Sequence, residues 1–279
     1  MSGEKAHVCS KEFSKNTRKN IVKMINKANS GHPGGSLSCT DILAVLYTKV
    51  LNIDPANPDW EERDRLILSK GHSAPALYAT LAGCGYCSEE ELLTFDQINS
   101  RFQGHPDMTA TPGVDMSSGS LGQRLSVGLG MALAAKRLQK NLNVWVIVGD
   151  GELQEGQIWE AAMSAFRYSL DNLNLIIDYN NLQLVGEVDK TLPVEPLSDK
   201  WKAFGWHVLE IDGHDHDQIL QATRYASAHK GGPTVIIAKT TKGKGVSFME
   251  DNYIWHSKGI SDEELNQALS EINQDGEEL

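Results

Sequence analysis

The hydrophobic residues of this chain alternate between short continuous runs and helically spaced positions. Five short segments rich in apolar residues are found, at 65–68, 144–148, 173–177, 207–211 and 234–238, and 144–148 is apolar at every position. Such runs are typical of strands in a parallel sheet that is covered on both faces, because neither face of the strand meets water. We therefore predict strands over all five segments, with those at 65–68, 144–148 and 173–177 buried.

Helical spacing of apolar residues fills the intervals between these runs. It predicts helices over 13–28, about 42–51 with Thr40 or Asp41 as its N-cap, 73–82, part of 119–139, 157–169 and 217–228. In the helix over 157–169 the pattern turns Ile158, Ala162, Ala165 and Phe166 inward. Strands that alternate with helices predict an α/β fold with a doubly wound, mostly parallel sheet flanked by helices.

The ends of the pattern are marked by residues that stop or start helices. The first helix is expected to end at Ser30-Gly31-His32-Pro33-Gly34-Gly35, because proline and glycine interrupt helices. Ser261 to Glu264 has the sequence of a capping box and predicts a short, acidic C-terminal helix. No long linker or repeat is found, so residues 1–279 are expected to form a single domain with an N-terminal helical segment.

Charge and hydropathy exclude several classes of protein. The 26 Lys and Arg residues against 37 Asp and Glu give a net charge of −11, which argues against nucleic acid as a partner, because nucleic-acid binding depends on basic surfaces. No apolar run approaches the roughly 20 residues that span a bilayer, and residues 1–14 lack the apolar core of a signal peptide. The composition predicts a cytoplasmic protein without membrane contact.

Four cysteines are present, and two of them, Cys84 and Cys87, form a CxxC pair. A structural zinc site needs two further ligands at suitable spacing, and the sequence offers neither a second CxxC nor a nearby HxxxH. We interpret the pair as reduced cysteines near the end of a helix.

Candidate chemistry follows two consecutive predicted strands. Gly149-Asp150-Gly151 comes directly after the 144–148 run, and Asn180 comes shortly after the 173–177 run. The 30 residues from Asp150 to Asn180 match one strand–helix–strand unit, whose two strands end at the same edge of the sheet. A carboxylate and an amide oxygen there suit Mg²⁺ or Ca²⁺. Gly151 would let a phosphate approach the backbone closely.

Each of these motifs has an ordinary structural explanation when taken alone. The Gly-Asp-Gly sequence is compatible with a tight turn, and Asn180-Asn181 with a loop; only their combined spacing favours a metal–diphosphate site. Other phosphate-binding motifs fit less well. There is no GxxxxGK[ST] sequence, and Gln154 occupies the position of the third glycine of GxGxxG, which weakens a dinucleotide site.

The order of several motifs resembles the transketolase family and its thiamine-diphosphate signature. The motifs are Ser30 to Gly35, Ser69-Lys70-Gly71-His72-Ser73-Ala74-Pro75, Gly104-His105-Pro106, Gly119-Ser120-Leu121-Gly122-Gln123, Gly149 to Gly156, and Trp255-His256. They span nearly the whole chain in the family's order. The resemblance is to the first part of a full-length transketolase, as in versions that are split into two subunits, and it implies the thiamine-diphosphate-binding fold.

The resemblance also implies roles for individual residues. The divalent metal, Mg²⁺ with Ca²⁺ or Mn²⁺ as alternatives, would be bound by the side chains of Asp150 and Asn180 and the backbone carbonyl of Leu182. The cofactor thiamine diphosphate would be held at its diphosphate by His72, Gly151, Lys242 and His256, and Asn180 belongs to the same binding site. Gly119, Ser120 and Leu121 would line the path of the cofactor.

Histidines are expected to serve both the cofactor and the sugar. By resemblance, His32, His105 and His256 would bind sugar hydroxyls and exchange protons, which suits imidazole because it titrates near neutrality. Their neighbouring glycines and prolines place most of them on loops, where functional groups concentrate. The remaining four are interpreted as structural: His207, His214, His216 and His229. Gly213-His214-Asp215 is expected to open the helix over 217–228.

Three further positions bear on the site. On chemistry alone, Lys242 is equally compatible with a solvated basic loop and with a diphosphate ligand. Gly35 stands where some relatives carry a hydroxyl side chain, and Arg124 stands where the family typically has glycine. Arg124 would either crowd the cofactor channel or meet an acidic group of a partner. Glu155 resembles a carboxylate at the family's subunit interface.

The resemblance implies an enzyme that works with a second polypeptide. The family supplies a glutamate and an aromatic residue from another α/β domain, so the expected partner is a C-terminal transketolase subunit, in an α2β2 heterotetramer. The expected reaction moves a two-carbon ketol unit between sugar phosphates, as in the pentose phosphate pathway. Alternatives are a deoxyxylulose-phosphate synthase or ketoacid dehydrogenase component, a nicotinamide dehydrogenase, and a non-catalytic scaffold subunit.

Overall fold

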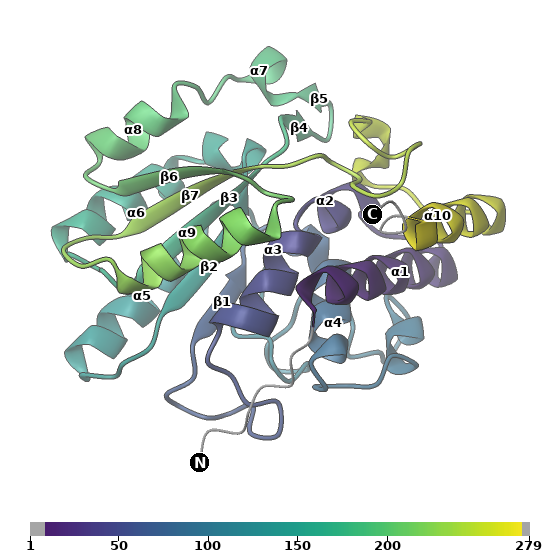
Figure 1. Cartoon of the computed structure of the whole chain (residues 1–279), viewed down its shortest axis with the longest axis horizontal. Helices are drawn as coiled ribbons and strands as arrows, with labels where there is room; N and C mark the ends of the chain where they lie inside the picture. The colour runs from purple at the N-terminus through teal and green to yellow at the C-terminus, as the bar shows by residue number, and fades with distance from the viewer. Residues whose placement is uncertain (1–8, 275–279) are drawn as a thin grey trace.

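Five parallel strands form the central sheet of the computed structural model, which describes residues 9–274 (Figure 1). The strands lie in the order β1-β2-β3-β7-β6. Their bounds are Arg65–Leu68 for β1, Val144–Gly149 for β2, Leu173–Tyr179 for β3, His207–Asp212 for β6 and Thr234–Lys239 for β7. All five predicted strands and the parallel sheet are confirmed.

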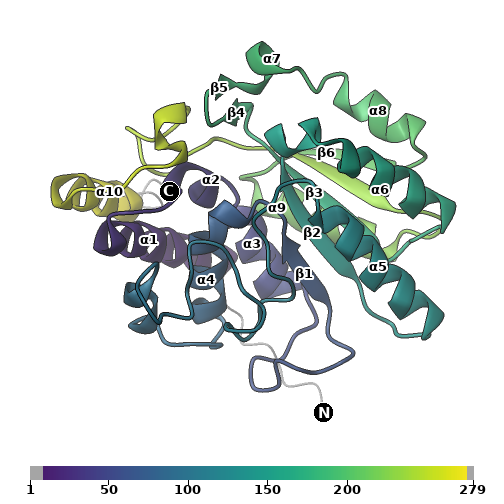
Figure 2. The same cartoon turned by 180° about the vertical axis from the view of Figure 1, so that it is seen from behind.

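Helices cover both faces of this sheet. One face packs against α1 Ser10–Ala28, α2 Pro33–Ser38, α3 Thr40–Val45, α4 Ala74–Gly83, α9 His216–Ala228 and α10 Asp262–Gln274. The other face, in front in Figure 2, packs against α5 Arg124–Arg137, α6 Gly156–Arg167 and α8 Leu197–Ala203. Two separate hydrophobic cores result, one on each side of the sheet.

Alternate side chains of a single strand belong to different hydrophobic cores. In β2, Trp145 and Ile147 belong to the core on the α1 side, and Val146 and Val148 belong to the core on the α5 side. Successive side chains of a strand point to opposite faces, so a strand buried on both faces has to be apolar at every position. This explains why the sequence shows continuous apolar runs.

Short elements connect the main ones. They are the 3₁₀ helices Gly71–Ser73, Glu91–Thr94, Gly151–Gln154 and Tyr253–His256, the π-helical segment Leu46–Val50, the short helix α7 Val188–Thr191, and the antiparallel hairpin of β4 Leu182–Gln183 and β5 Gly186–Glu187. The hairpin was not predicted, because two-residue strands leave no hydrophobic period. No helix within residues 9–274 has the length and apolar character required to cross a membrane.

The structure corrects three local predictions. Pro33 begins a helix instead of only ending one, since a proline at the first helical position lacks just an N–H that would be unpaired anyway. Cys39, and not Thr40 or Asp41, is the N-cap of α3; the Asp41 side chain instead pairs with Arg18. Phe166 is 51% exposed rather than inward, although its ring packs on Gly205.

Two predicted helix starts are confirmed by their hydrogen bonds. Ser261 N donates to Glu264 Oε2 at 2.8 Å, and Glu264 N donates to Ser261 Oγ at 3.2 Å, which is the predicted capping box. Asp215 caps α9 by accepting from the backbone of Asp217 and Gln218. These local signals are encoded within a few residues and therefore read correctly from sequence.

Candidate active site

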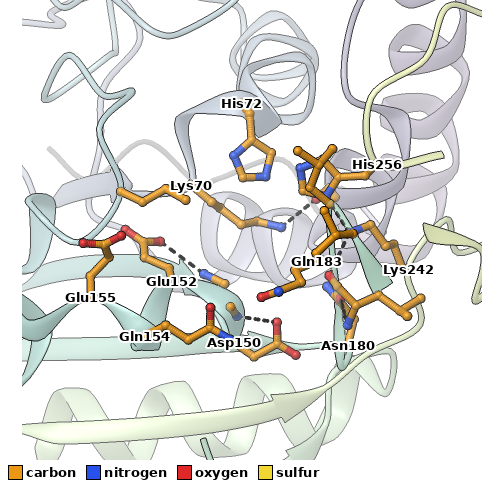
Figure 3. Close-up of a pocket in the computed structure, with 17 residues that line it drawn as sticks. Lys70, His72, Asp150, Glu152, Gln154, Glu155, Asn180, Gln183, Lys242 and His256 are labelled. Atoms are coloured by element: carbon orange, nitrogen blue, oxygen red, sulfur yellow. Dashed lines mark hydrogen bonds between the residues drawn. The ribbon is translucent and has the colours of Figure 1, made fainter. Parts of the chain in front are cut away.

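A cavity of about 310 Å³ opens at the carboxyl ends of β2 and β3. Parallel strand order explains its position, because Gly149 of β2 is paired with Asp178 of β3, and the residues that follow both strands emerge side by side. Asp150 and Asn180 therefore line the same cavity (Figure 3). The other lining residues are Gly35, Lys70, His72, Leu121, Gly149, Gly151, Glu152, Gln154, Glu155, Leu182, Gln183, Leu184, Val185, Lys242 and His256.

Asp150 is held rigidly at the floor of this cavity. Its Oδ1 accepts a hydrogen bond of 2.7 Å from Gly151 N, and its Oδ2 accepts one from Asn181 N. Burial and the nearby Asp178 carboxylate raise the pKa of Asp150 to about 7. A cation bound next to this buried carboxyl group would stabilise its charged form.

Asn180 and Leu182 present their oxygens in one short turn. Asn180 Oδ1 accepts from Leu182 N at 3.1 Å, and Asn181 between them has φ +56°, a left-handed conformation that asparagine tolerates. The carbonyl oxygen of Leu182 accepts from Lys242 Nζ at 2.8 Å. The turn therefore brings both predicted metal-ligand oxygens to the cavity that Asp150 lines.

A buried ion pair that the sequence did not reveal supports the cavity. Lys70 Nζ donates to the carboxylate of Asp178 and, at 2.6 Å, to the carbonyl of Gly35; Lys70 is 2% exposed and Asp178 is fully buried. Ser38 and Thr240 also donate to Asp178. Burial by itself would raise the pKa of Asp178, but Lys70 and these hydroxyls hold it below its usual value.

Lys70 and Asp178 were missed as functional residues. Lys70 lies within the Ser69-Lys70-Gly71-His72 motif, and Asp178 is the one charged residue of β3, Leu173–Tyr179. A charge inside a doubly buried strand needs a partner, and this was the available signal. Nothing local identified the partner, since the two residues are 108 positions apart.

Lys242 and His256 form the opposite wall of the cavity. Lys242 Nζ donates to His256 Nδ1 at 2.8 Å, so the other ring nitrogen, Nε2, carries the proton in the neutral imidazole. Burial, with Lys70 nearby, lowers the pKa of Lys242 to about 8. Burial and the charge of Lys242 lower the pKa of His256 to about 3.

Four histidines from distant parts of the chain gather beside this wall. The ring centroid of His32 lies 5.2 Å from that of His72, 5.7 Å from that of His256 and 6.4 Å from that of His105. Burial, and after it the charge of His105, lower the pKa of His32 to about 4. Burial and Lys70 hold the pKa of His72 well below its usual value. Neutral imidazoles at physiological pH can both donate and accept hydrogen bonds.

Of the remaining residues that were predicted to bind the cofactor, some line the cavity and others do not. Leu121 lines the cavity, and a Cβ at Gly119 would lie 3.6 Å from the His105 ring. Ser120 is exposed and does not line the cavity. A Cβ at Gly151 would lie 3.1 Å from Gln183 Oε1, so the missing side chain keeps the backbone there accessible.

The donor set is compatible with a hard divalent cation completed by a diphosphate. Within residues 9–274, no group of three His, Cys, Asp or Glu side chains is arranged to hold a metal. The available donors are instead one carboxylate, one amide oxygen and one backbone carbonyl. Mg²⁺ typically takes few protein ligands and completes its shell with water and phosphate oxygens, so these residues fit the predicted group.

Comparison with known proteins identifies the family. The family model described as transketolase, thiamine diphosphate binding domain, matches residues 9–278. The chain belongs to this family. The predicted fold class and the resemblance to transketolase are thereby confirmed, and thiamine diphosphate is the cofactor for which the family domain is named.

Individual relatives fall into two groups of different length. The chain is 47% identical over 259 residues to a 6-deoxy-6-sulfo-D-fructose transketolase subunit of Clostridium sp. (strain MSTE9), covering 93% of this chain and 94% of that one. It is 41% identical over 266 residues to an apulose-4-phosphate transketolase subunit of Phocaeicola vulgatus, covering 95% and 94%.

The second group consists of longer, single-chain transketolases. The human protein is 37% identical over 263 residues, covering 94% of this chain and 42% of its own length. The structure of transketolase from Leishmania mexicana superposes with a TM-score of 0.91 at 30% identity, covering 95% and 41%. The chain thus spans about two fifths of these transketolases.

The departures from the transketolase pattern now have structural explanations. A Cβ at Gly35 would lie 3.0 Å from Ser73 Oγ, a tight contact, and 3.6 Å from His72 Nε2, an ordinary van der Waals contact, so a side chain here would fill space next to the predicted cofactor-binding histidine. Arg124 does not line the cavity, and its Nε donates to the carbonyl of Ser117 at 2.6 Å; its expected contact with an acidic group of a partner stays a prediction. Both positions are compatible with an open cofactor cavity.

Two glutamates, Glu152 and Glu155, line the cavity. Glu152 is buried and accepts from Ser69 Oγ and, at 2.8 Å, from Gly122 N. Burial raises its pKa. Glu155 lines the cavity and precedes α6 as its N-cap residue.

The other four histidines, interpreted as structural from the sequence, lie away from the cavity. His214 and His216 contact Asp41 at 2.8 and 3.1 Å. The ring of His207 stacks on those of Tyr225 and His229, at 4.9 and 4.7 Å between centroids. None of the four lines the active-site cavity.

Proposed function

We propose that this chain is the thiamine-diphosphate-binding subunit of a two-chain transketolase. The enzyme would transfer a two-carbon ketol unit from a ketose phosphate to an aldose phosphate. One observation carries the proposal: Asp150 and Asn180 follow neighbouring strands and line one cavity together with Lys242 and His256. That cavity combines oxygen donors for a cation with nitrogen donors for a diphosphate.

The metal would be bound at the floor of the cavity. Asp150, Asn180 and the carbonyl of Leu182 are the proposed ligands, with Mg²⁺ as the ion and Ca²⁺ or Mn²⁺ as substitutes. The desolvated Asp150 carboxylate, whose pKa is raised to about 7, favours this assignment, because a bound cation would offset its burial.

The diphosphate would be bound between the metal and the opposite wall. His72, Lys242 and His256 supply N–H donors, and Gly151 supplies a backbone that a phosphate can approach. Gly119, Ser120 and Leu121 would flank the rest of the cofactor. Lys242 matters most electrostatically, because it is a cation already inside the cavity.

The sugar would meet the histidines. Thiamine diphosphate, when bound, supplies the carbanion chemistry that side chains lack. His32, His105 and His256 would bind hydroxyls of the sugar and exchange protons with them. The depressed pKa values of His32 and His256, about 4 and 3, keep both rings neutral at physiological pH, so His32 offers one acceptor and one donor nitrogen. His256 Nδ1 already accepts from Lys242, and His256 Nε2 remains as a donor.

A separate polypeptide would complete the site. Relatives of matching length are named as subunits of transketolases, whereas single-chain transketolases are more than twice as long as their match to this chain. The partner that we propose is a C-terminal transketolase subunit, in an α2β2 heterotetramer in the cytoplasm. Its substrates would be sugar phosphates, as in the pentose phosphate pathway, or related sugars such as the 6-deoxy-6-sulfo-D-fructose and apulose-4-phosphate of the relatives' names.

Titration of the cofactor tests the core of this proposal. Binding of thiamine diphosphate to the complex of both subunits should require Mg²⁺, and Asp150→Ala should abolish that dependence. Asp171→Asn is the matched control, because Asp171 lies outside the cavity in a surface ion pair with Lys136. If metal-dependent binding is the same in wild type and Asp150→Ala, the metal site is assigned wrongly.

A second assay separates transketolase from related thiamine enzymes. The complex should transfer ketol units from ketose phosphates and should not use pyruvate as the donor. Turnover with pyruvate but not with ketose phosphates would contradict the ketol-transfer proposal while leaving the cofactor site intact.

A further inference from the structure

The backbone that carries Lys242 is a short turn between β7 and the cavity. Lys244 N donates to the carbonyl of Thr241 at 3.3 Å and closes the turn. The Lys242 side chain leaves this turn and reaches Leu182 O and His256 Nδ1, each at 2.8 Å. The position of the ammonium in the cavity therefore depends on how the turn is anchored.

A histidine anchors the beginning of the turn. Thr241 N donates to His214 Nε2 at 2.8 Å. Because a backbone N–H can only donate, Nε2 has to be unprotonated, and the ring proton has to be on Nδ1. Nδ1 lies 2.8 Å from Asp41 Oδ2, which accepts that proton in a hydrogen bond. Asp41 therefore selects the tautomer that can hold Thr241.

An arginine anchors the end of the same turn to the same carboxylate. Arg18 Nε donates to the carbonyl of Lys244 at 3.1 Å. The two terminal nitrogens of Arg18 donate to Asp41 Oδ1 and Oδ2 at 3.0 and 2.6 Å. Such a fork restricts both the position and the plane of the guanidinium. Arg18 is 6% exposed and Asp41 4% exposed, so water competes little with these bonds.

The middle of the turn is restricted by close packing. Gly243 has φ +80°, its N–H donates to Gly34 O at 3.0 Å, and a Cβ at this position would lie 2.4 Å from Met249 O. The turn has no space in which to shift toward Met249. Asp251 N also donates to the carbonyl of Lys242 at 3.0 Å, and the two ends of the turn are held by the anchors at Thr241 and Lys244.

We propose that Arg18, Asp41 and His214, here called the Asp41 clamp, position Lys242 for the diphosphate of the cofactor. The clamp lies outside the active-site cavity, and its members are positioning residues that act through the backbone of Lys242. This inference rests on the proposed role of Lys242 in cofactor binding. It assigns to His214 a task beyond filling space in the core.

Another histidine provides the matched control. His216 Nε2 also contacts Asp41, at 3.1 Å, and its Nδ1 contacts Ser10 Oγ at 2.8 Å. It has no hydrogen bond to residues 241–244. His216→Asn therefore perturbs the same carboxylate without removing an anchor of the turn.

Two substitutions of His214 separate its two hydrogen bonds. In His214→Asn the side-chain amide occupies the place of Nδ1 and can still donate to Asp41, but the acceptor for Thr241 N is lost. In His214→Gln the longer amide reaches the place of Nε2, and its oxygen can accept from Thr241 N. If the clamp acts as proposed, His214→Asn should weaken the anchoring of the turn and the binding of the cofactor, and His214→Gln should restore most of both.

The experiment uses both subunits together and two measurements besides turnover. Hydrogen exchange of the 241–245 amides, without cofactor, reports the anchoring of the turn. Calorimetric titration with thiamine diphosphate and Mg²⁺ reports affinity. His214→Asn should accelerate exchange and raise the Kd by about fivefold or more, the effect of losing one hydrogen bond. At saturating cofactor kcat should stay near that of wild type, and His216→Asn should change neither measurement.

Combination with Lys242→Ala distinguishes the clamp from the role of Lys242 itself. If the clamp acts through Lys242, His214→Asn should add little to the Kd of Lys242→Ala. Equal effects in both backgrounds would overturn the clamp, as would unchanged exchange or unchanged affinity in His214→Asn alone. Wild-type affinity in Lys242→Ala would instead overturn the proposed role of Lys242, on which the clamp depends.

Discussion

The ammonium of Lys242 donates a 2.8 Å hydrogen bond to the backbone carbonyl of Leu182, the oxygen that we propose as a metal ligand. A lysine and a divalent cation cannot share one oxygen without strong repulsion, unless an anion lies between them. The diphosphate would be that anion. Metal binding and cofactor binding are therefore expected to be coupled through Lys242.

Replacement of Lys242 should separate the two binding events. Lys242→Ala is expected to tighten binding of Mn²⁺ alone, because it frees Leu182 O and removes a positive charge. The same change should weaken thiamine diphosphate binding by about tenfold, the loss of one charge-assisted hydrogen bond. The electron paramagnetic resonance signal of free Mn²⁺ measures the first effect, and calorimetry measures the second. Lys239→Ala, at an exposed site outside the cavity, is the control; weaker Mn²⁺ binding in Lys242→Ala would contradict the coupling.

Removal of Lys70 should destabilise the fold strongly. Lys70→Met leaves the fully buried Asp178 without its cation, and breaking such a pair costs about 3–5 kcal/mol. Urea unfolding measures this cost. The double variant Lys70→Met with Asp178→Asn should lose less than the sum of the single losses, because no charge is left unpaired. Lys136→Met, which breaks the surface pair with Asp171, should change stability by at most about 1 kcal/mol.

The ionised Asp41 carboxylate should make the free energy of unfolding decrease as the pH falls. Burial alone would raise the pKa of Asp41, but Arg18 and the bonds to His214 and His216 hold it well below its usual value. The folded chain thus binds this proton less readily than the unfolded chain does. The stabilisation is fully present above the unfolded pKa of about 4 and is lost as pH falls toward the folded value. In urea unfolding, the difference between wild type and Asp41→Asn should shrink from pH 6 to pH 3; a constant difference would contradict this pKa.

Gly122 should tolerate no side chain. It has φ +81°, and a Cβ there would lie 2.5 Å from Glu155 Cβ. Gly122→Ala is expected to cost about 1–3 kcal/mol from the left-handed backbone and the contact together. Gly156→Ala is the control, since a Cβ at Gly156 meets nothing within 4 Å and alanine favours a helix. Thermal unfolding compares the two variants, and equal melting temperatures would contradict the packing argument.

The strands and several helix boundaries could be predicted from residues that lie close together in the sequence. β2 is a continuous apolar run because both faces of the sheet are covered there, and its alternate residues lie in two cores. The edge strand β6 is less buried and carries His207 and Glu210. The capping box at Ser261 and the N-cap at Asp215 were readable because each is encoded within four residues. The start of α2 at Pro33 was not, because a proline that ends one helix can also begin the next.

The candidate site was readable only where chemistry follows a strand. Asp150 and Asn180 could be paired from sequence, since one strand–helix–strand unit separates them and consecutive parallel strands end at one edge. Lys70 and Asp178 could not be paired, nor could Thr241 and His214, because these contacts join elements whose relative position depends on the whole sheet order.

By itself, the amino-acid sequence determined the layered α/β architecture, the oxygen donors after β2 and β3, and the family to which the chain belongs. Tertiary structure alone decided which charges are neutralised and which backbone turns are held, including the Lys70–Asp178 pair and the anchoring of the Lys242 turn to Asp41. The physical reason is that hydrophobic periodicity and strand-end chemistry act over a few residues. Burial of a charge, by contrast, is compensated by whichever distant side chain the packed sheet and helices bring within hydrogen-bonding distance.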